Sequence, residues 1–118
     1  MKKILIVDDS QSALKILEYT LTEANYTVAS AKNAEEALKK VENEKFDIGV
    51  FDVNMPGING IELTKEVLSN PNGADMKIII LTTESSEKMK SAGKDAGAKG
   101  WLVKPFNDAD LLAVLGKL

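Results

Sequence analysis

Short strand-forming runs alternate with segments of helical periodicity along the whole chain, and this alternation limits the possible folds more than any other feature. Residues 4–7, 48–53 and 78–81 are rich in β-branched or aromatic residues and suit buried strands. Residues 26–30 and 101–103 complete the set, and the first of these is less apolar, as expected nearer a sheet edge. Five strands alternating with five helices predict an α/β fold, in which helices cover both faces of a parallel sheet.

The segments between these runs are expected to be helices, each with an apolar face. Ser10 and Asn33 are placed to cap the first two helices, and Asp108 can cap the last. The expected inward positions are Leu14, Leu17, Leu21 and Ala24; Ala34, Ala37, Leu38 and Val41; Ile61, Thr64, Val67 and Leu68; Met89, Ala92 and Ala96; and Leu111, Leu112, Leu115 and Leu118. The fourth helix, residues 84–96, contains Gly93, which costs about 1 kcal/mol relative to alanine. This helix is either marginally stable or an element that moves.

The chain has 118 residues, enough for one domain with one core, and we expect a single domain over residues 1–118. The formal net charge of −3 argues against direct binding of nucleic acid, because phosphate contacts need a basic surface. The apolar run near the N-terminus ends at Asp8 and is too short for a secretory signal, and no run approaches a membrane span. We therefore expect a cytoplasmic protein without a membrane partner.

Three residue types are missing from the chain, namely cysteine, histidine and arginine. Their absence excludes thiol chemistry, thiolate and imidazole metal ligands, histidine acid–base catalysis and bidentate guanidinium clamps. Any chemistry must therefore use carboxylates, hydroxyls, lysine, backbone amides and, where needed, a hard metal ion.

Polar side chains stand where four of the expected strands end. They are Asp8 and Asp9 after the first strand, Asp52 near the end of the third, Thr82 and Thr83 after the fourth, and Lys104 after the fifth. Any one of them could be a turn or cap residue. In a parallel sheet, however, all these ends lie at one edge, where sites are built. The sequence thus predicts that three carboxylates, a hydroxyl and an ammonium group converge there.

This combination of groups indicates phosphoryl chemistry. Clustered carboxylates repel one another, so they favour a hard cation such as Mg²⁺, which leaves positions open for a phosphoryl oxygen. A carboxylate can also act as the nucleophile that accepts a phosphoryl group. Lys104 and Thr82 would then balance charge on the transferred oxygens, a role that a purely structural metal site would not explain.

The motifs resemble those of the response regulator receiver domains of two-component signalling, in particular stand-alone chemotaxis regulators of the CheY type. The matching segments are Ile6-Val7-Asp8-Asp9-Ser10, Asp52 with Met55-Pro56-Gly57 and Gly60, Leu81-Thr82, Ala96-Gly97-Ala98, and Lys104-Pro105-Phe106. They span essentially the whole chain. The resemblance implies a flavodoxin-like, doubly wound (βα)5 sandwich with the sheet order 2-1-3-4-5, which periodicity alone does not give.

The resemblance also implies a role for each matching residue. Asp52 would be the phosphoacceptor. Mg²⁺ would be held by the side chains of Asp9 and Asp52 and by the backbone carbonyl of Asn54, with Asp8 acting through water. Lys104 would pair with a phosphoryl oxygen, and its peptide bond to the following proline is expected to be cis.

A conformational switch is implied in the same way. Thr82 would close over a phosphoryl oxygen, and Trp101 would rotate into the vacated space, which would alter the surface of helix four, strand five and helix five. The alternative for Trp101 is an ordinary half-buried core residue. Asn54 and Glu84 would flank the water that attacks the phosphoaspartate, and as polar residues they suggest no strong block to hydrolysis.

We therefore expect a phosphorylation-activated signalling switch, not an enzyme with an outside product. Its partners would be a sensor histidine kinase, whose phosphohistidine is the donor, and a downstream protein on the surface of helix four, strand five and helix five. The switch itself is expected to be a monomer. A receiver domain of a longer response regulator or hybrid kinase is an alternative. An aspartate-nucleophile phosphatase is disfavoured because Asn54 replaces its usual second acid, and a constitutive interaction module is disfavoured by the intact acidic set.

Overall fold

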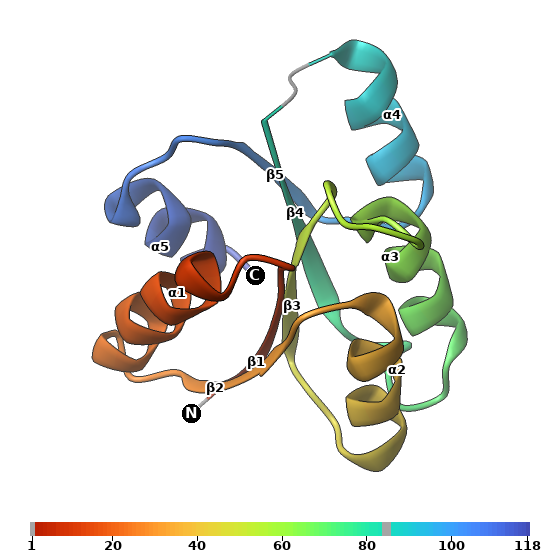
Figure 1. Ribbon diagram of the computed structural model, residues 1–118, viewed down its shortest axis with the longest axis horizontal. Coiled ribbons are helices and arrows are strands. Elements are labelled where there is room, and N and C mark those ends of the chain that lie inside the picture. The colour runs from red at the N-terminus through yellow and green to blue at the C-terminus, as the bar shows by residue number, and fades with distance from the viewer. Residues whose placement is uncertain (1, 84–85) are drawn as a thin grey trace.

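The computed structural model describes residues 2–83 and 86–118, and within them strands and helices alternate from end to end (Figure 1). The strands are β1 (Lys3–Val7), β2 (Thr27–Ala31), β3 (Ile48–Asp52), β4 (Lys77–Thr82) and β5 (Gly100–Val103). The helices are α1 (Gln11–Glu23), α2 (Ala34–Asn43), α3 (Gly60–Ser69), α4 (Glu87–Asp95) and α5 (Asp108–Gly116). The alternation expected from the sequence is confirmed.

The strands form one parallel sheet in the order β2-β1-β3-β4-β5, as the resemblance implied. β3 is central, and its five residues are all buried, with Asp52 at its carboxyl end. β2 is an edge strand, which explains its more polar composition. The sheet order therefore places the end of β3 between the ends of β1 and β4, where side chains from three strands can meet.

Two hydrophobic clusters lie on opposite faces of the sheet. In Figure 1, α1 and α5 cover one face, and α2, α3 and α4 cover the other. Phe51 belongs to the cluster under α2 and α3, whereas Ile4 and Leu111 belong to the cluster under α1 and α5. Alternate residues of each strand supply the two clusters, because side chains alternate between the two faces of a sheet.

Polar side chains begin the helices at the expected places, with one exception. The Ser10 hydroxyl accepts a hydrogen bond from an α1 amide, and Asn33 does the same for α2. α5 is capped by Asn107, whose Oδ1 accepts from the Asp110 N–H at 2.8 Å, so the prediction that Asp108 is the cap was wrong. Asp108 instead lies in the first turn, where its negative charge interacts favourably with the positive end of the helix dipole.

Most of the expected inward positions are buried, and the others are half-buried. Leu63 of α3 is fully buried although its burial was not predicted, because α3 packs against α2 as well as against the sheet. Leu68, expected to be inward, is only half-buried. α4 buries Gly93 alone within its bounds, so its thin apolar face is confirmed.

No helix in the described part of the chain is both long enough and apolar enough to cross a membrane.

Candidate functional site

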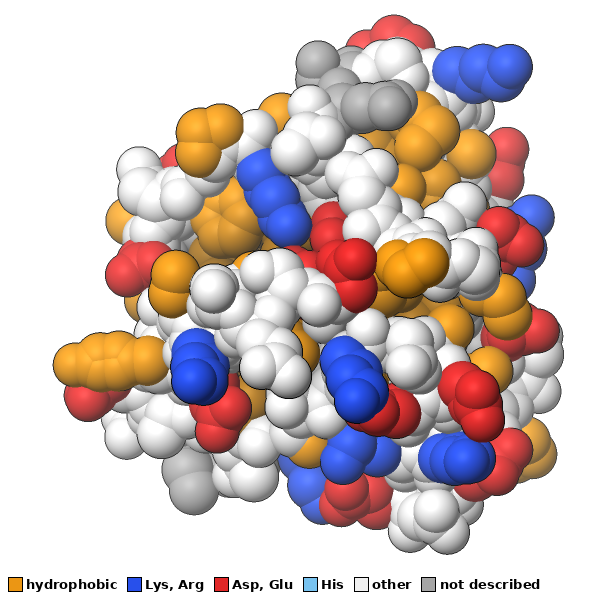
Figure 2. All heavy atoms as spheres, in the orientation of Figure 1, with side chains coloured by type: hydrophobic (Ala, Val, Ile, Leu, Met, Phe, Trp, Pro, Cys, Tyr) orange, Lys and Arg blue, Asp and Glu red, His pale blue; other side chains and the backbone are white. Residues whose placement is uncertain are grey.

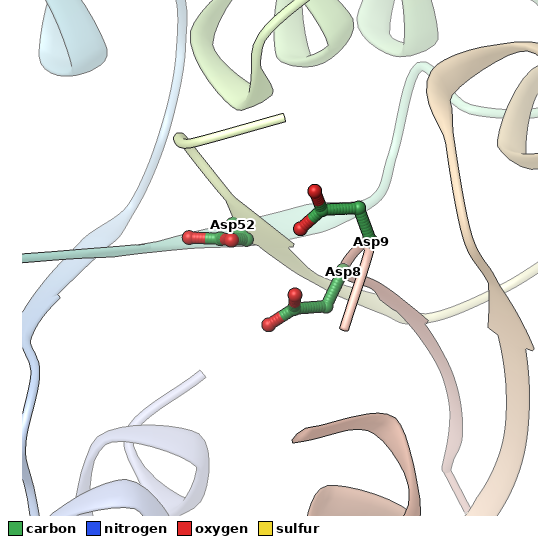
Figure 3. A group of neighbouring side chains, drawn as sticks. All are labelled: Asp8, Asp9 and Asp52. Carbon is green, nitrogen blue, oxygen red and sulfur yellow. The ribbon is translucent and has the colours of Figure 1, made fainter. Parts of the chain in front are cut away.

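Three carboxylates meet at the carboxyl ends of β1 and β3. Figure 2 shows acidic side chains gathered beside a lysine near the middle of this face, and Figure 3 shows Asp8, Asp9 and Asp52 facing a common space. One carboxylate oxygen from each of the three lies within 4.8 Å of the others. Asp8 and Asp52 are buried, whereas Asp9 is exposed. The predicted convergence of these three side chains is therefore present in the structure.

Lys104 brings the balancing positive charge from the end of β5. Its Nζ lies 3.2 Å from Asp8 Oδ2 and 3.4 Å from Asp52 Oδ1. Lys104 directly follows β5, and its backbone N–H donates to the Thr82 carbonyl at the end of β4 at 2.7 Å. Its peptide bond to Pro105 is cis, as expected. One ammonium group therefore faces two carboxylates, which leaves the site with an excess of negative charge.

Backbone amides hold the two buried carboxylates in place. The Ser10 N–H donates to Asp8 Oδ1 at 2.9 Å, and the Asn54 N–H donates to Asp52 Oδ1 at 3.4 Å. The start of α3 packs closely against the loop after β3. A Cβ built on Gly60 would lie only 2.4 Å from the Asp52 carbonyl oxygen. The glycine therefore lets α3 support the backbone that carries Asp52.

The pKa of Asp52 is raised above its ordinary value of 3.8. Burial is the main cause, because it disfavours the charged form, and the neighbouring charge of Asp8 acts in the same direction. Lys104 and the hydrogen bond from the Asn54 amide oppose the shift. An ionised Asp52 is thus destabilised in the folded protein, and a bound cation would relieve this.

Replacing Asp52 with asparagine should therefore raise the free energy of unfolding at neutral pH in the absence of Mg²⁺. An acid whose pKa is raised on folding stabilises the protein below its unfolded-state pKa, and this contribution is lost as the pH rises through the folded-state pKa. As the pH rises from 3.8, the free energy of unfolding of Asp52→Asn should therefore increase relative to that of wild type. Urea titrations at several pH values measure it.

Asp75→Asn provides the matched control, because Asp75 is an exposed carboxylate outside the site. Saturating Mg²⁺ supplies a second comparison. At a hundred times its dissociation constant, the ion should add about 2.7 kcal/mol to the wild type and much less to Asp52→Asn. An Asp52→Asn variant that is less stable than wild type at neutral pH without Mg²⁺ would contradict the account.

The donor set fits a hard divalent cation. Mg²⁺ prefers carboxylate, carbonyl and water oxygens, and here three carboxylates share one space without a nitrogen or sulfur ligand among the described residues. The exposed Asp9 is the carboxylate that solvent can reach, while Asp8 already accepts from Lys104 and the Ser10 amide. Asp52 is engaged in the same way, by Lys104 and the Asn54 amide, so Asp9 is the carboxylate most open to an incoming ion.

Thr82 and Trp101 share the sheet face that carries α4. Thr82 ends β4 and is fully buried. Trp101 pairs with Ile80 in the ladder between β4 and β5, and it packs half-buried against the cluster that contains Ile80. The buried indole N–H of Trp101 has no hydrogen-bond partner within the described part of the chain.

Gly93 of α4 has a packing role that sequence patterns did not reveal. A Cβ at this position would lie 2.7 Å from Cζ3 of Trp101, so the ring rests on the helix only because the residue is glycine. The sequence showed an unfavourable glycine within a helix but gave no reason for it. Glu84, predicted to influence hydrolysis, lies outside the described residues.

The chain matches the profile of the response regulator receiver domain over residues 4–116. Among curated proteins it is 39% identical over 112 residues to the alkaline phosphatase synthesis transcriptional regulatory protein PhoP of Bacillus subtilis, covering 95% of this chain and 46% of that protein. It is 36% identical to the response regulator ArlR of Staphylococcus aureus, covering 96% of this chain and 50% of ArlR. The chain thus spans about half the length of these relatives.

Solved structures show the same fold over nearly the whole chain. The chemotaxis protein CheY4 of Vibrio cholerae superimposes with a TM-score of 0.95 and 44% identity, covering 99% of this chain and 98% of that one. The response regulator TrrA of Thermotoga maritima, in complex with Mg²⁺ and beryllium fluoride, gives a TM-score of 0.87 and 37% identity, covering 99% and 98%.

Proposed function

Because this chain belongs to the response regulator receiver domain family, we propose that it is a switch activated by phosphorylation of Asp52. Two-component signalling through a receiver domain is the function of the family, and the particular residues and partners are our assignment. The observation that carries the assignment is the buried Asp52 carboxylate at the end of the central strand, within 3.4 Å of the Lys104 ammonium group and beside two further carboxylates.

The chemistry begins with attack by an Asp52 carboxylate oxygen on the phosphorus of a phosphohistidine. The new oxygen–phosphorus bond forms as the phosphorus–nitrogen bond breaks, and the histidine ring of the donor leaves with the electron pair of that bond. This chain contains no histidine, so the donor phosphohistidine lies outside it. A sensor histidine kinase is the partner of this kind in two-component signalling.

Two side chains are assigned to the transferred oxygens. Lys104, already within 3.4 Å of Asp52, neutralises charge that develops on one phosphoryl oxygen. The Thr82 hydroxyl binds another after a short movement of the end of β4. Mg²⁺, held by Asp9, Asp52 and the Asn54 carbonyl with Asp8 acting through water, would neutralise further charge and orient the phosphoryl group.

The output is assigned to the surface formed by α4, β5 and α5. Movement of Thr82 toward the phosphoryl group vacates space on the face of the sheet where Trp101 packs. Rotation of Trp101 into that space would remove the ring from Gly93 and so change the position of α4. The indole N–H, which has no partner among the described residues, and the thin apolar face of α4 both favour an element with two arrangements of similar free energy. A downstream protein then binds one of the two.

A groove beside the site offers the donor protein a place to dock. It has a volume of about 450 Å³ and lies between α1 and the segment after β5. Ile16 and Phe106 are among its apolar lining residues, and Asp8 and Lys104 are among its charged ones. Hydrophobic side chains are visible on this side of the face in Figure 2. Ile16 is 65% exposed, which is unusual for a large apolar side chain in this chain.

Ile16→Glu should slow phosphoryl transfer from the kinase by roughly tenfold or more, because a charge would replace an apolar contact near the centre of the docking surface. Transfer from acetyl phosphate should be unchanged, because a small donor needs no docking surface. Quench-flow measurements with both donors give the two rates. Lys65→Glu, on the exposed side of α3, is the matched surface control. An equal effect of Ile16→Glu on both donors would contradict the assignment.

The phosphoryl group is then lost by hydrolysis within the same site. Asn54 and Glu84 are assigned to the positions that flank the attacking water, and neither would exclude water from the acyl phosphate. The protein thus turns itself off and releases no product other than inorganic phosphate, so we describe it as a switch and not as an enzyme.

A stand-alone regulator of the CheY type is the favoured context, because the identity to the chemotaxis protein CheY4 is 44%, against 39% to PhoP and 36% to ArlR. A receiver domain within a longer regulator is the second candidate, because PhoP and ArlR are about twice as long. The mass of the natural protein in an extract of its source cells, measured by mass spectrometry after affinity capture with a specific antibody, distinguishes the two.

Fluorescence of Trp101 tests the proposed switch, because it is the single tryptophan of the chain. The expected result is a saturable change with Mg²⁺ and a further change with beryllium fluoride, the latter absent in Asp52→Asn. If the fluorescence responds to Mg²⁺ but not to beryllium fluoride, intact-mass analysis after treatment with acetyl phosphate decides between two explanations. Either Trp101 is insensitive to the modification, or phosphorylation does not occur. No mass increase would refute the proposed function.

A further inference from the structure

One hydrogen bond joins the loop after β3 to the loop after β4. The Asn54 side-chain amide donates from Nδ2 to the Thr83 hydroxyl oxygen at 3.3 Å. These residues are adjacent to the two central residues of the site, because the Asn54 backbone amide donates to Asp52 and Thr83 directly follows Thr82. Thr83 also lines the groove that Asp8 and Lys104 line.

The bond links two loops that phosphorylation should affect differently. The Asn54 loop is tied to Asp52 through its backbone, whereas the Thr83 loop would move with Thr82. A phosphoryl group on Asp52 would also place strongly charged acceptor oxygens close to the Asn54 amide. A charged phosphoryl oxygen is a stronger acceptor than a neutral hydroxyl, so the amide would gain by exchanging one acceptor for the other.

We propose that Thr83 is a positioning residue that holds the Asn54 amide away from the phosphoryl position until Asp52 is modified. In the unmodified protein, the Asn54–Thr83 bond stabilises the inactive arrangement of the two loops. Phosphorylation breaks the bond, and the amide transfers to a phosphoryl oxygen. The bond thus sets a threshold for activation. This inference rests on the proposed function, because it assumes that Asp52 is the acceptor.

Thr83→Val tests the inference, because valine keeps the shape of threonine but cannot accept a hydrogen bond. Thr83 is exposed at the end of a strand, so the substitution leaves the core intact. Calorimetric titration with beryllium fluoride at saturating Mg²⁺ measures the affinity of the full chain for a phosphoryl mimic. The affinity should rise roughly two- to tenfold, which corresponds to one net hydrogen bond. Thr83→Ser, which retains the acceptor, should behave as wild type.

A double-mutant cycle separates this role from a general effect on the loop. In an Asn54→Ala background, Thr83→Val should leave the affinity unchanged, because the amide is already gone. Unchanged or weaker binding by Thr83→Val alone would overturn the inference, and so would an equal gain in both backgrounds. Failure of the wild type to bind beryllium fluoride would instead refute the proposed function, so the two failures are distinguishable.

Discussion

Asp52→Asn should reduce incorporation of phosphoryl groups to background with either acetyl phosphate or a phosphorylated kinase as donor. The amide of asparagine is not a nucleophile toward phosphorus. Within the described residues, Asp8 is the one other buried carboxylate that pairs with Lys104. Phosphate-affinity electrophoresis and intact-mass measurement both detect the acyl phosphate. This is the largest functional effect that the account predicts.

Asp47→Asn is a matched control for that experiment. Asp47 lies just before β3, at the opposite end of the strand from Asp52, where its carboxylate accepts from the Lys3 amide. This variant should be phosphorylated at the wild-type rate. Residual phosphorylation of Asp52→Asn at a rate close to that of wild type would show that another residue is the acceptor.

Gly60→Ala should cost about 3 kcal/mol or more of the free energy of unfolding, the largest effect on stability that we predict for a single methyl group. The added Cβ would lie 2.4 Å from the Asp52 carbonyl oxygen and 3.2 Å from the Val53 Cα, and neither backbone atom can move without shifting the site. Chemical denaturation measures the loss. Because the clash involves the backbone of Asp52 itself, Mg²⁺ affinity should fall as well.

Gly116→Ala is the matched control, because Gly116 ends α5 and an added Cβ meets no atom within 4 Å. There the usual helix preference should appear, a gain of up to about 1 kcal/mol. Equal effects of the two substitutions would show that the close approach of α3 to the loop after β3 is absent in solution.

The fold could be predicted from the sequence to the level of elements, because strand and helix periodicities differ along this chain. The sheet order came only from resemblance, since periodicity describes each element separately and not its neighbours. Details that depend on packing were missed. Leu63 is buried on a helix that packs against α2 as well as against the sheet, and the cap of α5 is Asn107 because an acceptor is needed three residues before the Asp110 amide.

The convergence of the charged residues could be predicted, because each of them ends or follows a strand of a parallel sheet. The supporting contacts of the site could not be predicted in the same way. Gly93 and Gly60 are needed for close approach to Trp101 and to the Asp52 backbone, and a single sequence does not show which elements approach so closely. The bond between Asn54 and Thr83 likewise joins two loops whose distance depends on the finished fold.

Mapping the phosphorylated residue tests the central claim most directly. The protein would be treated with acetyl phosphate and Mg²⁺, reduced with borohydride to convert the acyl phosphate into a stable alcohol, and digested for peptide mass spectrometry. The account predicts modification at Asp52 alone, with a yield that depends on Mg²⁺. Modification at Asp8, Asp9 or another residue, or none at all in a folded and Mg²⁺-saturated sample, would contradict it.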